Sequence, residues 1–213
     1  MFNFFKKSPS FRITDKVWKT NDDAWRGMAT DAMRIITQGE IPIIVCYFDE
    51  SKKRLFTYLS AQGIPCYELN PETVANSAYQ SKVIFCVNAF EAEPILKLSL
   101  LEKMKIHFLF ESHYPLPEPE QKLTEALFAL TQAPVFTFYL SIDGPLMQIF
   151  DSGNLIPLME KMGLKDDECV EHRIVSSAIR RAQEKISEHV GTPFEVRTSS
   201  EKEWYDRNAR KRV

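Results

Sequence analysis

The segment Val135–Gln183, VFTFYLSIDGPLMQIFDSGNLIPLMEKMGLKDDECVEHRIVSSAIRRAQ, decides the fold. Its first residues, Val135–Leu140, form an apolar run that predicts a strand. Further on, Arg173–His189 predicts a helix with one apolar stripe, because apolar residues recur in it at helical spacing. The stripe consists of Val175, Ala178, Ile179, Ala182 and Ile186. Such a stripe must pack against another element, so we expect a helical extension docked on a body that contains the strand.

Upstream of this segment, strand-like and helix-like patterns alternate. Apolar runs predict strands at Ile41–Phe48, Cys66–Leu69, Val83–Ala89 and Ile106–Phe110. Helical patterns cover Asn21–Gln38, Ser51–Gln62, Glu91–Met104 and roughly Glu118–Leu130. Strands that alternate with helices imply right-handed crossovers and a mainly parallel sheet with helices on both faces, which is the α/β class.

The strand pattern stops after Phe150. Helical patterns follow at Leu155–Met162 and at Arg173–His189. The last stretch, Gly191–Val213, is polar, and we expect it to be loosely ordered.

Composition limits the function classes. The 213 residues suffice for one sizeable domain with a helical appendage, and 44% of them are apolar, enough to build a core. The net charge of -2 gives no long-range attraction to nucleic acid or anionic lipid. We therefore expect no nucleic-acid partner.

The four cysteines, Cys46, Cys66, Cys86 and Cys169, form no C-x-x-C pair. Zinc sites use clustered ligands, so we expect reduced thiols and no metal or other cofactor. No apolar stretch approaches the roughly 20 residues that cross a bilayer, and the N-terminus has no signal-peptide pattern. These features predict a cytoplasmic protein.

The order of residues in Val135–Gln183 resembles one stretch of the preprotein translocase motor SecA. In that family an F-Y-L-S strand continues into D-x-L-M-x-I-F, then M-x-x-x-G-L, then E-H-x-x-V-x-x-A-I-x-x-A-Q. The matching residues here are Phe138, Tyr139, Leu140, Ser141, Leu146, Met147, Ile149, Phe150, Met159, Met162, Gly163, Leu164, Glu171, His172, Val175, Ala178, Ile179, Ala182 and Gln183.

Weaker matches extend the resemblance upstream, to the second nucleotide-binding motor domain of SecA. Ile41–Ile64 is similar to P-V-L-V-G-T-x-S-I-E-x-S-E-x-L-S-x-x-L-x-x-x-G-I, and Val83, Asn88 and Ala89 fall on V-T-I-A-T-N-M-A-G-R-G-T-D. Glu111 and His113 fall on E-R-H-E. The resemblance implies an N-terminal arm over residues 1–12, a RecA-like domain over 13–150, and a helical extension over 151–213 that corresponds to the start of the SecA scaffold.

Departures from the family pattern predict that motor chemistry is lost. The Q-L-R-G-R-A-G-R motif becomes QKLTEALF, with Glu125 and Phe128 at the two arginine-finger positions. An arginine finger can contribute about three to five orders of magnitude in rate, and an anionic side chain there would repel a γ-phosphate. The sequence also has no G-x-x-x-x-G-K-[ST] loop to cradle phosphate. We therefore expect no catalytic residues.

Several residues carry alternative interpretations. Asn88, Glu111 and His113 would be vestigial nucleotide-facing positions, although Glu111 and His113 together could act as an acid and a base; capping of a strand end is the favoured role. By the resemblance, Glu171 and His172 lie where the α/β domain meets its helical scaffold, with Ile179 in the same junction. There we favour packing and hydrogen bonding over proton transfer.

The expected function is that of a non-catalytic SecA-like module, a protein-binding or scaffold domain linked to protein export. Ligands of open α/β sheets gather at the carboxyl ends of the strands, so we expect a protein partner on a rim there. The candidate rim residues are Glu91, Glu93, Tyr114 and Glu118. One alternative is an accessory ATPase half completed in trans by a separate P-loop subunit, although such a subunit should retain its arginines.

The N-terminus offers a second alternative contact. Phe2, Phe4, Phe5, Lys6 and Lys7 could touch an anionic surface, which would place the protein peripherally at the inner membrane. So few residues would need a second signal for stable binding.

Overall fold

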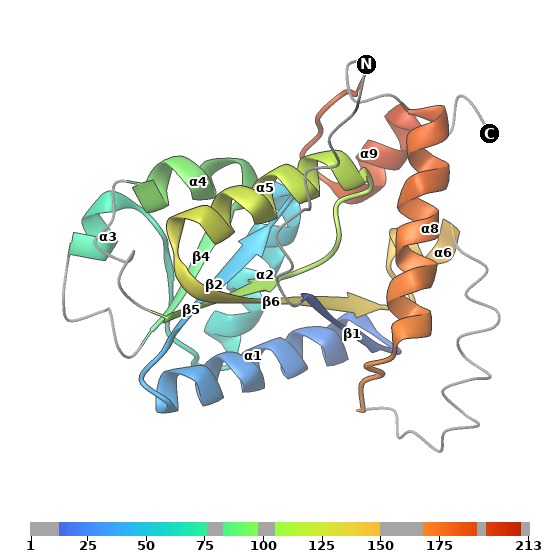
Figure 1. Ribbon diagram of the computed structural model, residues 1–213. Helices are drawn as coiled ribbons and strands as arrows, with labels where there is room; N and C mark the ends of the chain where they lie inside the picture. The colour runs from blue at the N-terminus through green and yellow to red at the C-terminus, as the bar shows by residue number, and fades with distance from the viewer. Residues whose placement is uncertain (1–12, 76–82, 98–104, 150–167, 191–194, 210–213) are drawn as a thin grey trace.

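The computed structural model describes residues 13–75, 83–97, 105–149, 168–190 and 195–209 (Figure 1). Its strands are β1 (Ile13–Trp18), β2 (Ile41–Cys46), β3 (Cys66–Glu68), β4 (Ile84–Asn88), β5 (Lys105–Phe110) and β6 (Gln132–Ser141). Its helices are α1 (Asn21–Thr37), α2 (Asp49–Ala61), α3 (Pro71–Ala75), α4 (Ala89–Lys97), α5 (Pro117–Leu130), α6 (Pro145–Ile149), α8 (Arg173–His189) and α9 (Glu201–Asn208).

The six strands form one sheet in the order β1-β6-β5-β2-β4-β3, and every named pair is parallel. From β2 the chain continues to β3, toward one edge of the sheet. From β5 it continues to β6, toward the opposite edge. The carboxyl ends of β2 and β5 therefore flank the switch point at which ligands of open α/β sheets bind. The predicted fold, α/β with a RecA-like parallel sheet, is confirmed.

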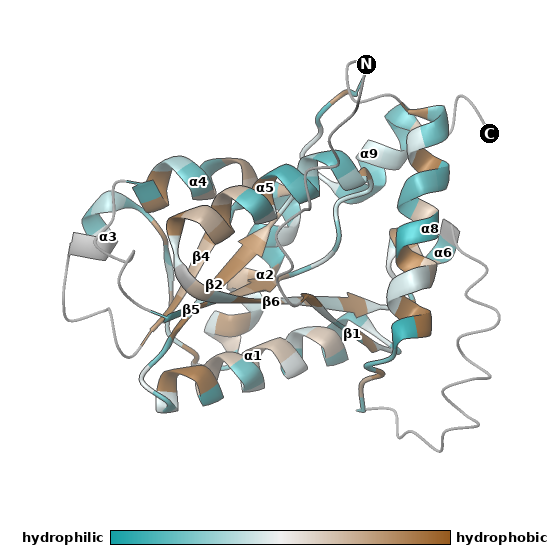
Figure 2. Cartoon of the chain, in the orientation of Figure 1, coloured by the Kyte–Doolittle hydropathy of each residue, from teal (hydrophilic) through white to brown (hydrophobic). Residues whose placement is uncertain are grey.

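Helices cover both faces of the sheet (Figure 1), and the strands between them are coloured mostly as hydrophobic (Figure 2). On one face, Met28 of α1 and Leu55 and Leu59 of α2 pack over strand residues such as Ile44. The other face is lined by phenylalanines of β4, β5 and β6, on which α4, α5, α8 and α9 pack. All six residues of β2 are buried, which explains why this strand reads as a continuous apolar run.

Helix α8 docks through its apolar stripe, as the sequence predicts. Val175, Ile179 and Ala182 are each 1% exposed and belong to the same core as the phenylalanine face, whereas Ile174, on the opposite side of the helix, is 54% exposed. Just before the helix, Val170 exchanges backbone hydrogen bonds with Val17 of β1. The stripe and this bridge fix α8 beside the edge strand of the sheet.

The C-terminal tail corrects one expectation. Instead of being loosely ordered, residues 195–209 pack on the body, and α9 begins at a regular N-cap, in which the Ser200 hydroxyl accepts a hydrogen bond from the Glu203 amide. Trp204 is fully buried in the core of the phenylalanine face. Two neighbouring aromatic residues, Trp204 and the 7% exposed Tyr205, thus anchor an otherwise polar helix.

The cysteines are reduced in the structure, as the sequence predicts. Cys46 and Cys86 are buried on neighbouring strands, and all four cysteines are free thiols. The predicted arm over residues 1–12 and the predicted helix Leu155–Met162 lie outside the described residues. Within the part that is described, no helix has the length and apolar character that a membrane span requires.

The docking of α8 gives a first test, the substitution Ile179→Asp. It would bury an unpaired carboxylate in the core, so we expect the free energy of unfolding to fall by about 3–5 kcal/mol. Urea denaturation followed by circular dichroism measures this. The matched control is Ile174→Asp on the exposed side of the same helix, which should change stability by less than about 0.5 kcal/mol. Equal effects of the two substitutions would contradict the docking.

Candidate functional site

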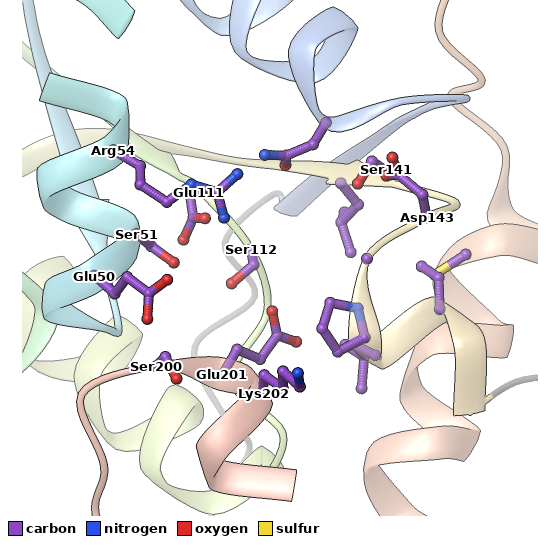
Figure 3. A pocket seen from close by; sticks show the side chains of 16 residues that line it. Glu50, Ser51, Arg54, Glu111, Ser112, Ser141, Asp143, Ser200, Glu201 and Lys202 are labelled. Carbon is purple, nitrogen blue, oxygen red and sulfur yellow. The ribbon is translucent and has the colours of Figure 1, made fainter. Parts of the chain in front are cut away.

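A cavity of about 270 Å³ lies at the switch point of the sheet. It is bounded by Ser51 and Arg54 of α2, by Glu111 and Ser112 after β5, and by Ser141 at the end of β6 (Figure 3). Residues of α9 form the side away from the sheet. The cavity therefore lies where the topology predicts a ligand, with part of its wall made by the C-terminal helix.

Glu111 is the buried acid of this cavity. It follows β5 directly, and its amide donates to the Val45 carbonyl of β2, which fixes the backbone at this point. Burial raises the pKa of Glu111 to about 7, against the opposing effects of a hydrogen bond from Ser51 and the charge of Arg54. Its Oε2 atom and the hydroxyl of neighbouring Ser112 are both buried without a hydrogen-bond partner.

Glu201, in the first turn of α9, is a second acid of the cavity. Burial, and then repulsion from Glu111, raise its pKa to about 8. Two carboxyl groups are thus placed in one partly enclosed space, one on the sheet and one on the covering helix. Each disfavours ionisation of the other, so near neutral pH the pair holds its protons more tightly than free carboxylates do.

The segment 195–208 covers the carboxyl edge of the sheet next to the cavity. Trp204 donates from Nε1 to Glu195 at 2.7 Å, and the Tyr114 hydroxyl donates to the same carboxylate. The Glu50 amide donates to the Ser199 carbonyl at 3.0 Å, and the Arg197 guanidinium lies 4.1 Å from the centre of the Phe90 ring. The segment therefore contacts the first turns of α2 and α4 and the loop that follows β5.

His113 belongs to a separate buried cluster. Its Nδ1 lies 2.9 Å from both carboxylate oxygens of Glu120, and its Nε2 lies 3.1 Å from Oδ1 of Asp15. The imidazole ring also stacks on Phe138, with centroids 4.0 Å apart. Burial by itself would lower the pKa of His113, but the two carboxylates raise it to about 10. His113 thus ties β1, the end of β5 and α5 together as a buried cation, which is a structural role.

Comparison with known proteins identifies what the chain resembles. It is 27% identical over 192 residues to the protein translocase subunit SecA of Solidesulfovibrio magneticus, covering 86% of this chain and 23% of that protein. It is 23% identical over 195 residues to SecA of Halothermothrix orenii, with 87% of this chain and 23% of that protein covered. Most of the chain is similar to part of SecA.

The similarity to SecA is higher over a short stretch. A match of 60 residues to SecA of Clostridium kluyveri reaches 47% identity, covering 28% of this chain and 7% of that protein. The chain spans about a quarter of the length of the SecA proteins that match most of it. No protein-family model matches the chain. Among solved structures, the C-terminal part of the Fun30 ATPase domain superposes with a TM-score of 0.43 and 13% identity, covering 78% of this chain and 54% of that one.

The positions that the SecA motifs assigned to nucleotide contact are separated in the structure. Asn88, at the end of β4, donates to Asp49 and accepts from the Phe90 amide, so it caps the turn into α4. Glu125, on α5, accepts from Gln121 one turn earlier, and Phe128 on the same helix is 36% exposed. Of the assigned residues, Glu111 alone lines the cavity.

The predicted partner rim needs one correction, which concerns Tyr114. This residue is 1% exposed, because its ring packs against Trp204 and other aromatic rings beneath the C-terminal segment. The three acids of the rim remain accessible: Glu91 is exposed, Glu93 pairs with Lys97, and Glu118 pairs with Lys122. A groove of about 350 Å³ lies between α4 and α5 beside these acids.

The predicted junction residues lie at the start of α8. Glu171 forms a salt bridge with Lys16 of β1 at 3.3 Å, and the His172 side chain caps α8 by accepting from the Ile174 amide at 3.1 Å. Ile179 is buried about two helical turns further along α8. The three residues are placed where packing and hydrogen bonding join the helix to the body.

Sequence reasoning missed Glu195, Glu201 and Trp204. The pattern S-x-x-E at Ser200–Glu203 is a capping-box signal for the start of α9 and could have been read. A lone tryptophan in a polar tail was the second available signal, since a residue of this size seldom remains exposed. Nothing in the sequence indicates that Glu201 faces Glu111, because that contact depends on how α9 docks.

The His113 cluster gives a pH-dependent prediction. Because the folded-state pKa is about 10 and the unfolded value 6.5, this stabilisation is complete below pH 6.5, declines as the pH rises, and is lost above about pH 10. We expect His113→Gln to cost on the order of a few kcal/mol at pH 6 and clearly less at pH 10. Urea unfolding at both values measures the difference. The control His189→Gln, at an exposed site on α8, should show no such pH dependence, and a constant cost for His113→Gln would refute the assignment.

Proposed function

We propose that the chain is a non-catalytic SecA-like module that binds a protein partner in association with protein export. The observation that carries this proposal is the covered carboxyl edge: segment 195–208 occupies the side of the sheet on which ligands of this fold class bind. The similarity to SecA over 86% of the chain supports the link to export. We place the protein in the cytoplasm, where it would meet the export machinery.

Two features of the molecule argue against ATP chemistry. Glu125 and Phe128 stand at the positions of the family's finger arginines, and the cavity at the switch point contains two carboxyl groups of raised pKa. A triphosphate brought to this cavity would meet four carboxyl groups against only two cations, Arg54 and Lys202. The same substitutions weigh against an ATPase half completed in trans, since that role requires an arginine supplied across the interface.

The partner surface that we propose is the groove between α4 and α5, defined by Phe90, Glu93, Pro119, Leu123 and Arg197. Phe90 is 38% exposed, which is unusual for a large aromatic side chain and typical of an interface anchor. Glu91 and Glu118 extend the groove with negative charge. Acids and cations both line the groove, with Lys122 and Arg197 opposite Glu93 and Glu195 in charge, so the exposed Glu91 is the acid best placed to attract a Lys or Arg beside an apolar side chain of the partner.

The first test of this function concerns nucleotide. Isothermal titration of the purified chain with Mg-ATP should give no heat of binding, because the sequence has no G-x-x-x-x-G-K-[ST] loop and Glu125 and Phe128 stand at the finger positions. Phosphate release measured under the same conditions should equal the protein-free background. A dissociation constant in the micromolar range, or release above background, would overturn the non-catalytic assignment.

The second test concerns the partner. The double substitution Glu91→Lys with Glu93→Lys should abolish recovery of a specific partner in affinity purification from the native cell, because it reverses the charge beside the groove. The matched control reverses two exposed acids of α8, Glu184→Lys with Glu188→Lys, and should leave recovery unchanged. If the first variant recovers every partner, the interface lies elsewhere on the molecule.

A further inference from the structure

The cavity at the switch point is separate from the proposed partner groove, and the proposed function does not use it. Its two long walls differ in character. Leu140, Leu146 and Met147 form an apolar wall on the β6–α6 side, and all three are buried. The opposite wall carries Glu111 and Ser112, with Glu201 beside them on α9, as Figure 3 shows. A ligand that matches the cavity would therefore have an apolar portion and a polar end.

The charge of the cavity favours a cationic end. Four carboxyl groups line the space, those of Glu50, Glu111, Asp143 and Glu201, against the two cations Arg54 and Lys202. The acids therefore outnumber the cations by two, and a bound cation would favour the ionised forms of Glu111 and Glu201, whose pKa values burial raises to about 7 and about 8. The guanidinium of Arg54 also lies over the Trp25 ring, 5.4 Å from its centre, so this cation is already engaged on its own side of the sheet. An anionic ligand would disfavour ionisation of the same two carboxyl groups and is a poorer match.

Unpartnered polar atoms point to a ligand that donates hydrogen bonds. Glu111 is only 9% exposed, and neither its Oε2 atom nor the Ser112 hydroxyl has a hydrogen-bond partner of normal geometry, although Ser51 and Ser112 lie close enough to oppose the rise in the pKa of Glu111. Such buried acceptors are costly until a donor reaches them. The terminal torsion of a glutamate is broad and nearly two-fold, so rotation of the carboxyl group can turn either oxygen toward the cavity that Glu111 lines.

These requirements define a chemical class. An alkylammonium group supplies three donors and one positive charge, and a short alkyl chain would contact the apolar wall. Among the residues that the structure describes, no group of three or more metal-ligating side chains is suitably placed, so a metal ion is a poorer match. We propose that this cavity binds a primary ammonium group on a short alkyl chain, held by Glu111, Glu201 and Ser112.

The test uses n-butylamine as the probe and n-butanol as its neutral counterpart, titrated into the full chain at pH 8 by isothermal calorimetry. An alkylamine is still protonated at this pH. We expect butylamine to bind with a dissociation constant on the order of 1 mM, in keeping with the limit for so few atoms, and butanol to bind at least about tenfold more weakly. Equal affinity of the two probes would overturn the proposal.

Variants locate the binding. Glu111→Gln keeps the shape of the side chain and removes its charge, so it should weaken butylamine at least about tenfold, as expected for a lost hydrogen bond to a charged group. Glu201→Gln should weaken it as well, and serves as the decisive variant if Glu111→Gln does not fold. The control Glu93→Gln, outside the cavity, should bind as the unmodified chain does. Unchanged affinity in both cavity variants would exclude the site.

The ammonium could come from a free amine or from a lysine side chain, and a second pair of probes separates these sources. If N-acetyl-lysine amide binds at least about tenfold more tightly than butylamine while N-acetyl-norleucine amide does not bind, the natural ligand is a polypeptide. If butylamine binds at least as well as the lysine derivative, the natural ligand is a free amine. Binding of none of these amines refutes the proposal. Because the assay uses no partner and no nucleotide, its result does not depend on the proposed function.

Discussion

The constraint on which this structure depends is that a parallel sheet must be covered on both faces. One face is satisfied by α1 and α2, whose Met28, Leu55 and Leu59 pack on it. The other carries a row of phenylalanines, including the stacked pair Phe110 and Phe138, and its core includes side chains of α8 and α9 as well as those of α4 and α5. Helix α8 contributes its stripe and α9 contributes Trp204. The C-terminal extension is therefore part of the core, and its docking is what closes the carboxyl edge.

That closure has an electrostatic consequence at the switch point. Trp204 and Glu195 fix α9 against Tyr114, and the first turn of the helix then brings Glu201 to the cavity that Glu111 already lines. Both carboxyl groups acquire raised pKa values, so each contributes stability that diminishes as the pH rises above its unfolded value. The tail thus docks with a local penalty at one point, and a bound cation would reduce that penalty.

The sequence predicts the strands and helices of the molecule well, because the burial of each element determines the local spacing of its apolar residues. The run Ile41–Phe48 is continuous because β2 is covered on both faces, and the stripe through Ile179 repeats at helical spacing because α8 docks on one side. Contacts between residues that are far apart in the sequence produce no such local pattern. His113, Asp15 and Glu120 meet from three elements, and Tyr114 is buried by a tail about ninety residues further along the chain. The sequence therefore predicts that Tyr114 follows a strand at the rim, while its burial depends on a helix whose docking cannot be read locally.

The carboxyl edge also explains how a fold can keep its architecture while its chemistry changes. The strand order and the crossover helices depend on the apolar residues of the two cores, and none of these needs a phosphate-binding loop or an arginine finger. Residues at the carboxyl ends of the strands must instead be compatible with the element that packs against that edge of the sheet. Here that neighbour is the chain's own segment 195–208, which offers Trp204 to Tyr114 and Arg197 to Phe90. Because this segment packs on the edge, aromatic rings and acids at the strand ends have partners within the chain, as Tyr114 has in Trp204 and Glu195.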